Sequence, residues 1–273
     1  MSWARIMAPL SGGADDKAAL AAAAALAEPF GAEVAGVYTP ADVADLMPWF
    51  GEGFMGGVQA TALESLQEAA AIGEAQARRA FDATSYANKR FLSLQTPVWA
   101  QLSAEGRLSD VVVFASEAAR GRGPLAESFQ QMVADEQRPV LVARPGLSVS
   151  GCVLVAWDGG KEASRAARLA TPLLEKASRV VVVSVSKAGG RICDPEQLQN
   201  YYGHRGVKAE VQHVTAGGSG VEVGRALLET AGRVGATMMV AGAFGHPRLQ
   251  EFIFGGTTRT LLNSDGPSLF LSH

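Results

Sequence analysis

The chain repeats one order of apolar and glycine-rich segments, and this repeat constrains its fold more than any other feature of the sequence. The first copy opens with residues 5–13, Arg-Ile-Met-Ala-Pro-Leu-Ser-Gly-Gly, and the second with residues 152–160, Cys-Val-Leu-Val-Ala-Trp-Asp-Gly-Gly. The later corresponding segments, first copy against second, are 32–38 and 180–185, 110–114 and 237–241, and 138–142 and 266–270. A shared order of segments indicates two copies of one structural unit.

The apolar segments are short, rich in β-branched residues and separated by amphipathic stretches of helical length. This alternation predicts an α/β fold in which each repeat has a parallel sheet with helices on both faces. In the second repeat we expect strands at 153–156, 180–185, 207–214, 238–241 and 268–271, and helices at 162–176, 195–202, 221–235 and 255–263. In the first repeat we expect a longer second helix at 59–86, with Thr96 and Pro97 as the cap and first-turn proline of a short third helix.

The turn-rich segment 145–151 is the expected boundary between the repeats. We therefore place the first repeat at residues 1–146 and the second at residues 151–273. An insert in the first repeat, at residues 47–57, contains three aromatic residues among glycines. We interpret it as a loop over apolar surface, with a lid over a ligand as the alternative.

The composition excludes several classes of protein. The 273 residues include 24 lysines and arginines against 27 acidic residues, so a net charge of −3 offers little attraction to nucleic acid. The sequence lacks the run of roughly eighteen apolar residues that a membrane span needs. The 2 cysteines and 4 scattered histidines form neither a disulfide framework nor a metal-ligand pattern. We expect a cytoplasmic protein without a metal centre.

Glycines gather after the predicted fourth strand of the second repeat. Gly242 and Gly245 follow that strand, and Gly255 comes nine intervening residues later, where a new helix begins. Glycine lets the backbone approach a ligand closely, and the free N–H groups at a helix start suit a phosphate. The hydroxyls of Thr257 and Thr258 can add donors.

Asp158, Val185 and Gly242 lie at the ends of three predicted parallel strands. Ligands of open parallel sheets bind outside the carboxyl ends of the strands. We therefore expect these three residues and the helix start at Gly255 to line one crevice. The alternative is that the glycines only make turns and that Asp158 or Ser164 caps a helix.

The spacing of Gly242, Gly245 and Gly255 resembles the nucleotide-binding motif of the universal stress protein family, and the duplicated layout resembles its tandem members. The resemblance implies a five-stranded parallel sheet in each repeat and pairing of the repeats as an internal pseudo-dimer. It also implies binding of ATP or another adenine nucleotide, with or without Mg²⁺.

The resemblance assigns Asp158 to the ribose or adenine and Val185 to the adenine pocket. The residues that it places around the ribose and phosphates are Gly242, Gly245, Gly255, Gly256, Thr257 and Thr258. Gly256 departs from the pattern, because the family usually has serine or threonine directly after the third glycine. The lost hydroxyl would cost about 0.5 to 1.5 kcal/mol, and the backbone N–H group remains.

The first repeat departs further from the motif. Leu10 replaces the acid at the strand end, and Ala-Ser-Glu-Ala at residues 115–118 replaces the first glycine pair. Glu117 would repel a phosphate. We therefore expect the first repeat to bind no nucleotide and to pair with the second through antiparallel edge strands near Val140 and Ser268.

Residues 11–16 offer a competing interpretation, because Ser-Gly-Gly-Ala-Asp-Asp resembles the pyrophosphate loop of ATP pyrophosphatases. Asp16 stands where that loop has a hydroxyl residue, so we favour a turn in which Asp15 or Asp16 caps the next helix. No catalytic set is tied to the glycine crevice, and enzymatic activity is expected to be at most weak ATP hydrolysis. The alternative to nucleotide binding is a nucleotide-free protein that recruits an unidentified protein partner, alone or as a further homodimer.

Overall fold

The computed structural model describes residues 2–41, 56–186, 194–243 and 255–273. The chain divides into two compact units. One is Ala4–Phe129, and the other is Gln130–His273 together with the N-terminal residues up to Trp3.

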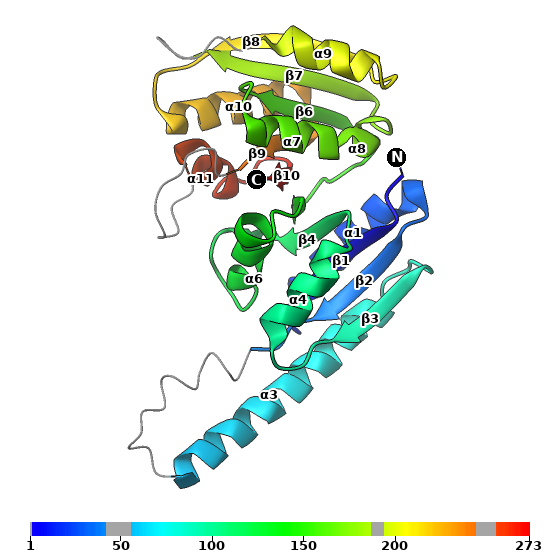
Figure 1. Ribbon diagram of the computed structural model, residues 1–273, viewed down its shortest axis with the longest axis vertical. Coiled ribbons are helices and arrows are strands. Elements are labelled where there is room, and N and C mark those ends of the chain that lie inside the picture. The colour runs from blue at the N-terminus through cyan, green and yellow to red at the C-terminus, as the bar shows by residue number, and fades with distance from the viewer. Residues whose placement is uncertain (1, 42–55, 187–193, 244–254) are drawn as a thin grey trace. The chain divides into compact units, whose positions relative to one another are not determined.

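The first unit contains a parallel sheet in the order β3-β2-β1-β4. Its strands are β1 (Arg5–Leu10), β2 (Glu33–Tyr38), β3 (Lys89–Ser93) and β4 (Val111–Ala115). Its helices are α1 (Asp16–Ala27), the short η1 (Glu28–Phe30), α3 (Gly56–Asp82), α4 (Val98–Arg107) and α5 (Ser116–Ala119), and α6 (Ala126–Gln130) lies where this unit ends. Figure 1 shows the N-terminal half of α3 extending past the end of this sheet.

The second unit contains six strands in the order β5-β10-β9-β6-β7-β8. They are β5 (Val140–Ala143), β6 (Cys152–Trp157), β7 (Arg179–Ser186), β8 (Ala209–Thr215), β9 (Ala236–Gly242) and β10 (Ser268–Ser272). The helices are α7 (Lys161–Leu169), α8 (Thr171–Leu174), α9 (Pro195–Gly203), α10 (Gly220–Val234) and α11 (Gly256–Leu262), preceded by a π-helical turn at Gln131–Asp135.

Strand β5 pairs with β10 in antiparallel register, with Leu141 opposite Phe270. This confirms the expected pairing of the two edge strands. All other described pairs of the second unit are parallel, so β6 to β10 form the expected five-stranded parallel sheet. Because β5 pairs with β10, this last strand of the first copy belongs to the same compact unit as the second copy.

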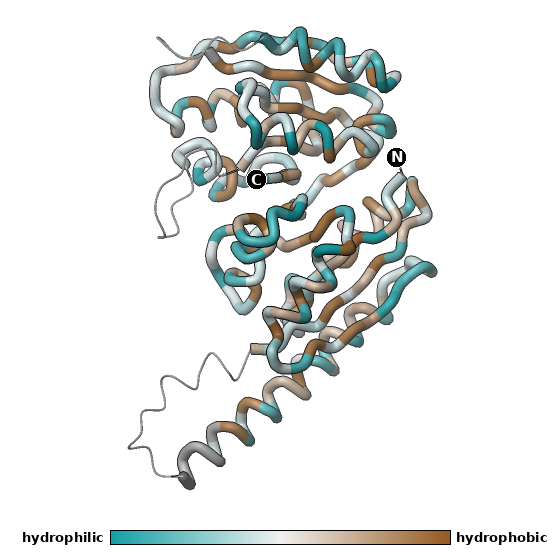
Figure 2. Tube along the Cα trace, viewed as in Figure 1, coloured by the Kyte–Doolittle hydropathy of each residue, from teal (hydrophilic) through white to brown (hydrophobic). Residues whose placement is uncertain are grey.

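The helices of the second unit cover both faces of its sheet (Figure 1). Right-handed crossovers between parallel strands place α7 and α9 on one face and α10 and α11 on the other. The Tyr202 hydroxyl of α9 donates to the Ala167 carbonyl of α7, and Gly224 of α10 lies against Thr260 of α11. The strands between these layers are hydrophobic along most of their length (Figure 2). Their valines at 153, 155 and 180–183 are at most 2% exposed and form the core.

The expected elements are all present, with differences at their ends. The helix expected at 162–176 is two helices, because Pro172 stands in the first turn of α8 and cannot donate to a continuous helix. The long helix α3 ends at Asp82, and Pro97 is the N-cap of α4 instead of its first helical residue. None of the described helices combines the length and apolar character that crossing a membrane requires.

Candidate functional site

The candidate site of the second unit lies at the carboxyl edge of its sheet. Strand β6 lies between β7 and β9, and Asp158 directly follows β6. Trp157 pairs with Ser184, so Asp158 and Val185 are the next neighbours along these two strands. Gly242 ends β9 on the other side of β6. The fold therefore brings the ends of the three expected strands to one edge.

Asp158 is exposed, and its Oδ1 accepts the N–H of Gly160 at 2.8 Å. The N-cap residue of α7 is Gly160, so this helix start has no side-chain cap. The Ser164 hydroxyl donates to the Gly160 carbonyl at 2.8 Å and does not accept from a backbone N–H group as a cap would. The interpretation that Asp158 or Ser164 caps this helix is therefore wrong. Asp158 instead closes a local turn that leaves its carboxylate open to solvent.

Gly242 is required by packing within the protein. A Cβ atom at this position would lie 2.5 Å from the Ala163 nitrogen and 2.7 Å from the Glu162 carbonyl carbon. The first turn of α7 therefore occupies the space that any other residue would need. Glu162, which is only 8% exposed, lies beside this strand end, and its carboxylate pairs with Lys161 at 3.4 Å.

Gly256 lies where α11 meets α10. A Cβ atom on Gly256 would lie 3.2 Å from the Val221 nitrogen, and one on Gly220 would lie 2.9 Å from the Thr257 nitrogen. The two helix starts therefore touch backbone to backbone. This close contact gives a physical reason for a glycine where the universal stress protein motif usually has a hydroxyl residue.

The two threonines after Gly256 are also engaged within the protein. The Thr257 hydroxyl donates to the Gly220 carbonyl at 3.0 Å, and Thr258 is only 7% exposed. The hydroxyl donors that we expected at this helix start are thus used or covered. The donors that remain for a ligand are backbone N–H groups of the first turn of α11.

Gly255, the N-cap of α11, differs from the other glycines of the motif. Its φ of −55° is open to any residue, and no heavy atom of the described residues lies within 4 Å of the Cβ position. Neither backbone conformation nor packing in the described part of the chain requires glycine here. Gly245 lies outside the described residues, as does the insert at 47–57 up to Met55, whereas Gly56 and Gly57 begin α3.

Two groups near α11 were not predicted from the sequence. Ser219 and Glu222 form a capping box at the start of α10, and the hydroxyl and N–H of Ser219 hold the pKa of the Glu222 carboxyl below its usual range. The spacing of serine and glutamate was a usable signal for this box. The second is Arg144, a 7% exposed arginine after β5 that reaches the other end of α11. No local pattern in the sequence marks it.

The equivalent edge of the first unit is filled by its own side chains. The Asp16 carboxylate, 2% exposed, accepts the N–H groups of Ser11 at 3.0 Å and Gly12 at 2.8 Å. Burial raises the pKa of Asp16 although these hydrogen bonds oppose the rise. Asp15 is the N-cap of α1 without a side-chain cap, so the expected capping by Asp15 or Asp16 is wrong. Asp16 binds the preceding loop instead.

Helix α3 covers the end of β2 in the same unit. The Tyr38 hydroxyl donates to the Ala70 carbonyl at 2.8 Å, and Ser93 donates to the Glu74 carboxylate at 2.8 Å. Glu117, in α5 directly after β4, is paired with Arg120 at 3.1 Å and with Arg122 at 3.4 Å.

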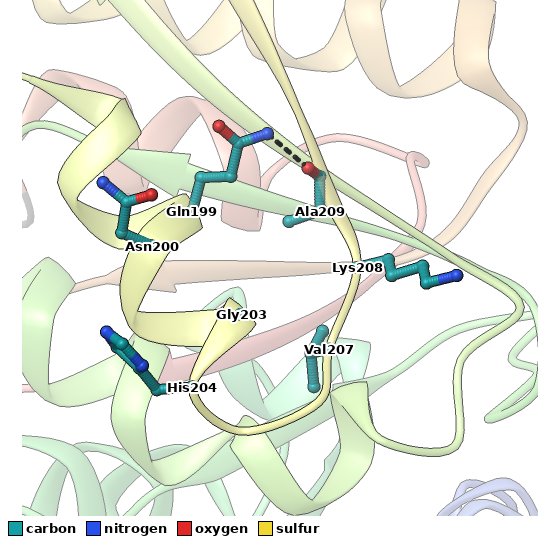
Figure 3. Close-up of a pocket in the computed structure, with 7 residues that line it drawn as sticks. All are labelled: Gln199, Asn200, Gly203, His204, Val207, Lys208 and Ala209. Atoms are coloured by element: carbon teal, nitrogen blue, oxygen red, sulfur yellow. Dashed lines mark hydrogen bonds between the residues drawn. The ribbon is translucent and has the colours of Figure 1, made fainter.

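A separate surface pocket of about 590 Å³ lies between α9 and β8. Figure 3 shows that the His204 and Lys208 side chains point away from each other, and that Gln199 donates to the Ala209 carbonyl at 2.7 Å. Ala209 begins β8, so this pocket lies at the opposite end of the sheet from Asp158. Its side chains do not converge on a common point, and we assign it no ligand.

Comparison with known proteins relates the fold to solved structures. The sequence matches no family model and no curated protein. A universal stress protein from Archaeoglobus fulgidus superposes with a TM-score of 0.60 at 14% identity, covering 98% of this chain and 95% of that one. A putative universal stress protein from Pseudomonas aeruginosa has a TM-score of 0.54 at 15% identity, covering 99% and 93%. A functionally unknown protein from the same organism has a TM-score of 0.52 at 16% identity, covering 99% and 92%. The chain therefore has the universal stress protein fold over nearly its whole length.

Proposed function

We propose that the chain is a stress-response protein of the universal stress protein family and that its second repeat binds ATP or another adenine nucleotide. The observation that carries this proposal is the convergence of an exposed acid, Asp158, with a half-buried apolar residue, Val185, and a glycine-rich helix start at one sheet edge. Gly255 adds weight, because the described part of the chain gives it no packing reason to be glycine.

Each part of this edge suits a different part of a nucleotide. The free oxygen of Asp158 can accept from a ribose hydroxyl or an adenine amino group, and the Val185 side chain can pack against the flat base. The first N–H groups of α11 can donate to a phosphate. Asp158 and Glu162 are both acidic, so a triphosphate would bind more readily with Mg²⁺ to offset its charge.

The first repeat supports the proposal by contrast. Its loop N–H groups at Ser11 and Gly12 already bind the Asp16 carboxylate, and α3 covers the end of β2. We therefore propose one nucleotide for each chain, with the first repeat as the packing partner of the second. Two equivalent ATP sites in a titration would contradict this.

The proposed chemistry is binding. Nucleotide occupancy would change the contact with an unidentified protein partner in the cytoplasm, and hydrolysis would be slow at most. Asp158 would lie at the base and sugar end of the nucleotide, too far from the phosphates to act as a general base.

Mass spectrometry of gently purified protein, followed by ATP titration, tests the proposal. We expect one bound adenine nucleotide for each chain. Gly255→Val should remove binding without unfolding the protein, because the new side chain meets open space in the described structure. Gly232→Val in α10 is the matched control, since its Cβ also meets nothing within 4 Å. Unchanged affinity in Gly255→Val would mean that the nucleotide binds elsewhere, and no binding by the unmodified chain would favour the nucleotide-free interaction protein.

A further inference from the structure

We propose that Arg144, contributed by the end of the first repeat, is a positioning residue for the nucleotide site of the second repeat. The inference rests on the proposed function, and it gives the first repeat a direct part in that site. Arg144 follows strand β5, which pairs with β10 within the same compact unit.

The Arg144 side chain caps the carboxyl end of α11. Its Nη2 donates to the Leu261 carbonyl at 2.7 Å and to the Leu262 carbonyl at 3.1 Å, and its Nη1 donates to the Pro267 carbonyl at 2.9 Å. Helix ends leave their last carbonyl groups without partners, and a cation there also complements the helix dipole. One guanidinium thus joins the last turn of α11 to the loop before β10.

The backbone at Arg144 is fixed as firmly as its side chain. Its N–H donates to the Ser268 hydroxyl at 3.0 Å, and the residue is only 7% exposed. A buried arginine held at both its backbone and its guanidinium has little freedom to move. It therefore links β5 and β10 to α11 and fixes where the end of this helix lies.

The opposite end of α11 carries the proposed phosphate contacts. The helix has 7 residues, so Arg144 acts about 10 Å from the Gly256 N–H group. Thr257 holds that end through the Gly220 carbonyl, at 3.0 Å. Arg144 and Thr257 thus anchor the two ends of α11, in addition to the contact of its Thr260 with Gly224. Removing Arg144 releases the last turn of α11 from the loop before β10 and so changes the direction in which the first N–H groups point.

Lysine cannot replace this arrangement. The planar guanidinium donates to three carbonyl groups in two directions, whereas an ammonium group is a single point on a flexible stem. We expect Arg144→Met to weaken ATP affinity roughly tenfold and Arg144→Lys to weaken it less.

The test compares these variants with Leu141→Ala in the full chain. Leu141 is fully buried in β5 and lies on the other face of the strand from Arg144, because side chains alternate. It should lower stability without releasing α11. The readouts are ATP affinity, melting temperature and the amide NMR signals of Gly256 and Thr257 without nucleotide.

Arg144→Met should weaken binding and move both amide signals, whereas Leu141→Ala should lower the melting temperature with affinity and signals unchanged. If Arg144→Met and Leu141→Ala both lost ATP affinity in proportion to their loss of stability, the inference would be overturned. Unmoved Gly256 and Thr257 signals in Arg144→Met would overturn it even if the unmodified chain bound no ATP. Absence of ATP binding with moved signals would overturn the proposed function and the nucleotide part of the inference, and it would leave Arg144 as an anchor of α11.

Discussion

Gly12 lies directly against Gly73: a Cβ atom added to Gly12 would be 2.5 Å from the Gly73 carbonyl oxygen. Gly12 also has a φ of +82°, a conformation that other residues adopt only with strain. The contact joins the loop after β1 to helix α3. Gly73 also lies against the Tyr38 hydroxyl at the end of β2. The carboxyl edge of the first sheet is thus closed by backbone contacts as well as by the Asp16 carboxylate.

Because α3 packs so closely here, adding one methyl group at Gly73 should lower the stability of the protein. A Cβ atom at Gly73 would lie 2.5 Å from the Tyr38 hydroxyl oxygen, so Gly73→Ala must displace the ring or the helix. We expect a loss of about 1 to 3 kcal/mol in the free energy of unfolding, measured by urea denaturation. Gly232→Ala is the control, because it is also helical but meets open space and should gain up to about 1 kcal/mol. Equal effects of the two substitutions would show that α3 does not press on Tyr38.

Asp16 predicts a pH dependence with a defined sign. Burial raises the pKa of its carboxyl above the unfolded value of roughly 3.9, so the folded chain binds this proton more tightly than the unfolded chain. The stability that the group contributes is therefore fully present below the unfolded pKa and is lost as the pH rises through the folded pKa.

Comparison with Asp16→Asn isolates this contribution. The asparagine oxygen can still accept from the Ser11 and Gly12 N–H groups, but it does not titrate. The stability of the unmodified chain minus that of Asp16→Asn should fall as the pH is raised from about 4 towards neutrality. The measurement is urea unfolding of both proteins at a series of pH values. A difference that grows with pH would mean that the loop N–H groups outweigh burial.

The sequence predicted most of the fold, because the signals were local and repeated. Short β-branched runs such as 180–185 marked strands, and the correspondence of the segments near Val140 and Ser268 predicted the antiparallel junction. The sequence could not predict which side chains fill the carboxyl edge of the first sheet. Asp16 and Ser11 are five residues apart in sequence, and their hydrogen bond depends on the loop conformation.

The candidate site was predictable in place but not in detail. Topology alone brings Asp158 and Gly242 to one edge, since β6 and β9 are neighbours. The hydrogen bond from the Thr257 hydroxyl to the Gly220 carbonyl depends on how closely α10 approaches α11, and it joins residues 37 apart in sequence. The role of Arg144 likewise depends on contacts 117 residues away. Spacing within a motif carries no information about such contacts.

The capping box of α10 predicts a local effect. In Ser219→Ala the Glu222 N–H loses its acceptor, and the loss should cost about 1 kcal/mol of stability. The Glu222 carboxyl also loses a hydroxyl donor, so its pKa should rise towards the usual glutamate range. In the unmodified chain this lowered pKa gives stability that is present above the unfolded pKa and lost as the pH falls through the folded value. Carboxyl NMR titration of both proteins checks this, and an unshifted Glu222 would contradict the assigned cause.

Restoring the hydroxyl that is usual in the universal stress protein motif should not simply restore affinity. In Gly256→Ser the new Cβ would lie 3.2 Å from the Val221 nitrogen, so α10 and α11 must separate by a few tenths of an ångström. That shift would also strain the hydrogen bond from Thr257 to Gly220. We therefore expect about 1 kcal/mol of lost stability and no gain in ATP affinity, measured by thermal unfolding and calorimetric titration. Unchanged stability and tighter binding in Gly256→Ser would show that α10 moves aside at little cost, and that the close approach of Gly220 does not explain the glycine.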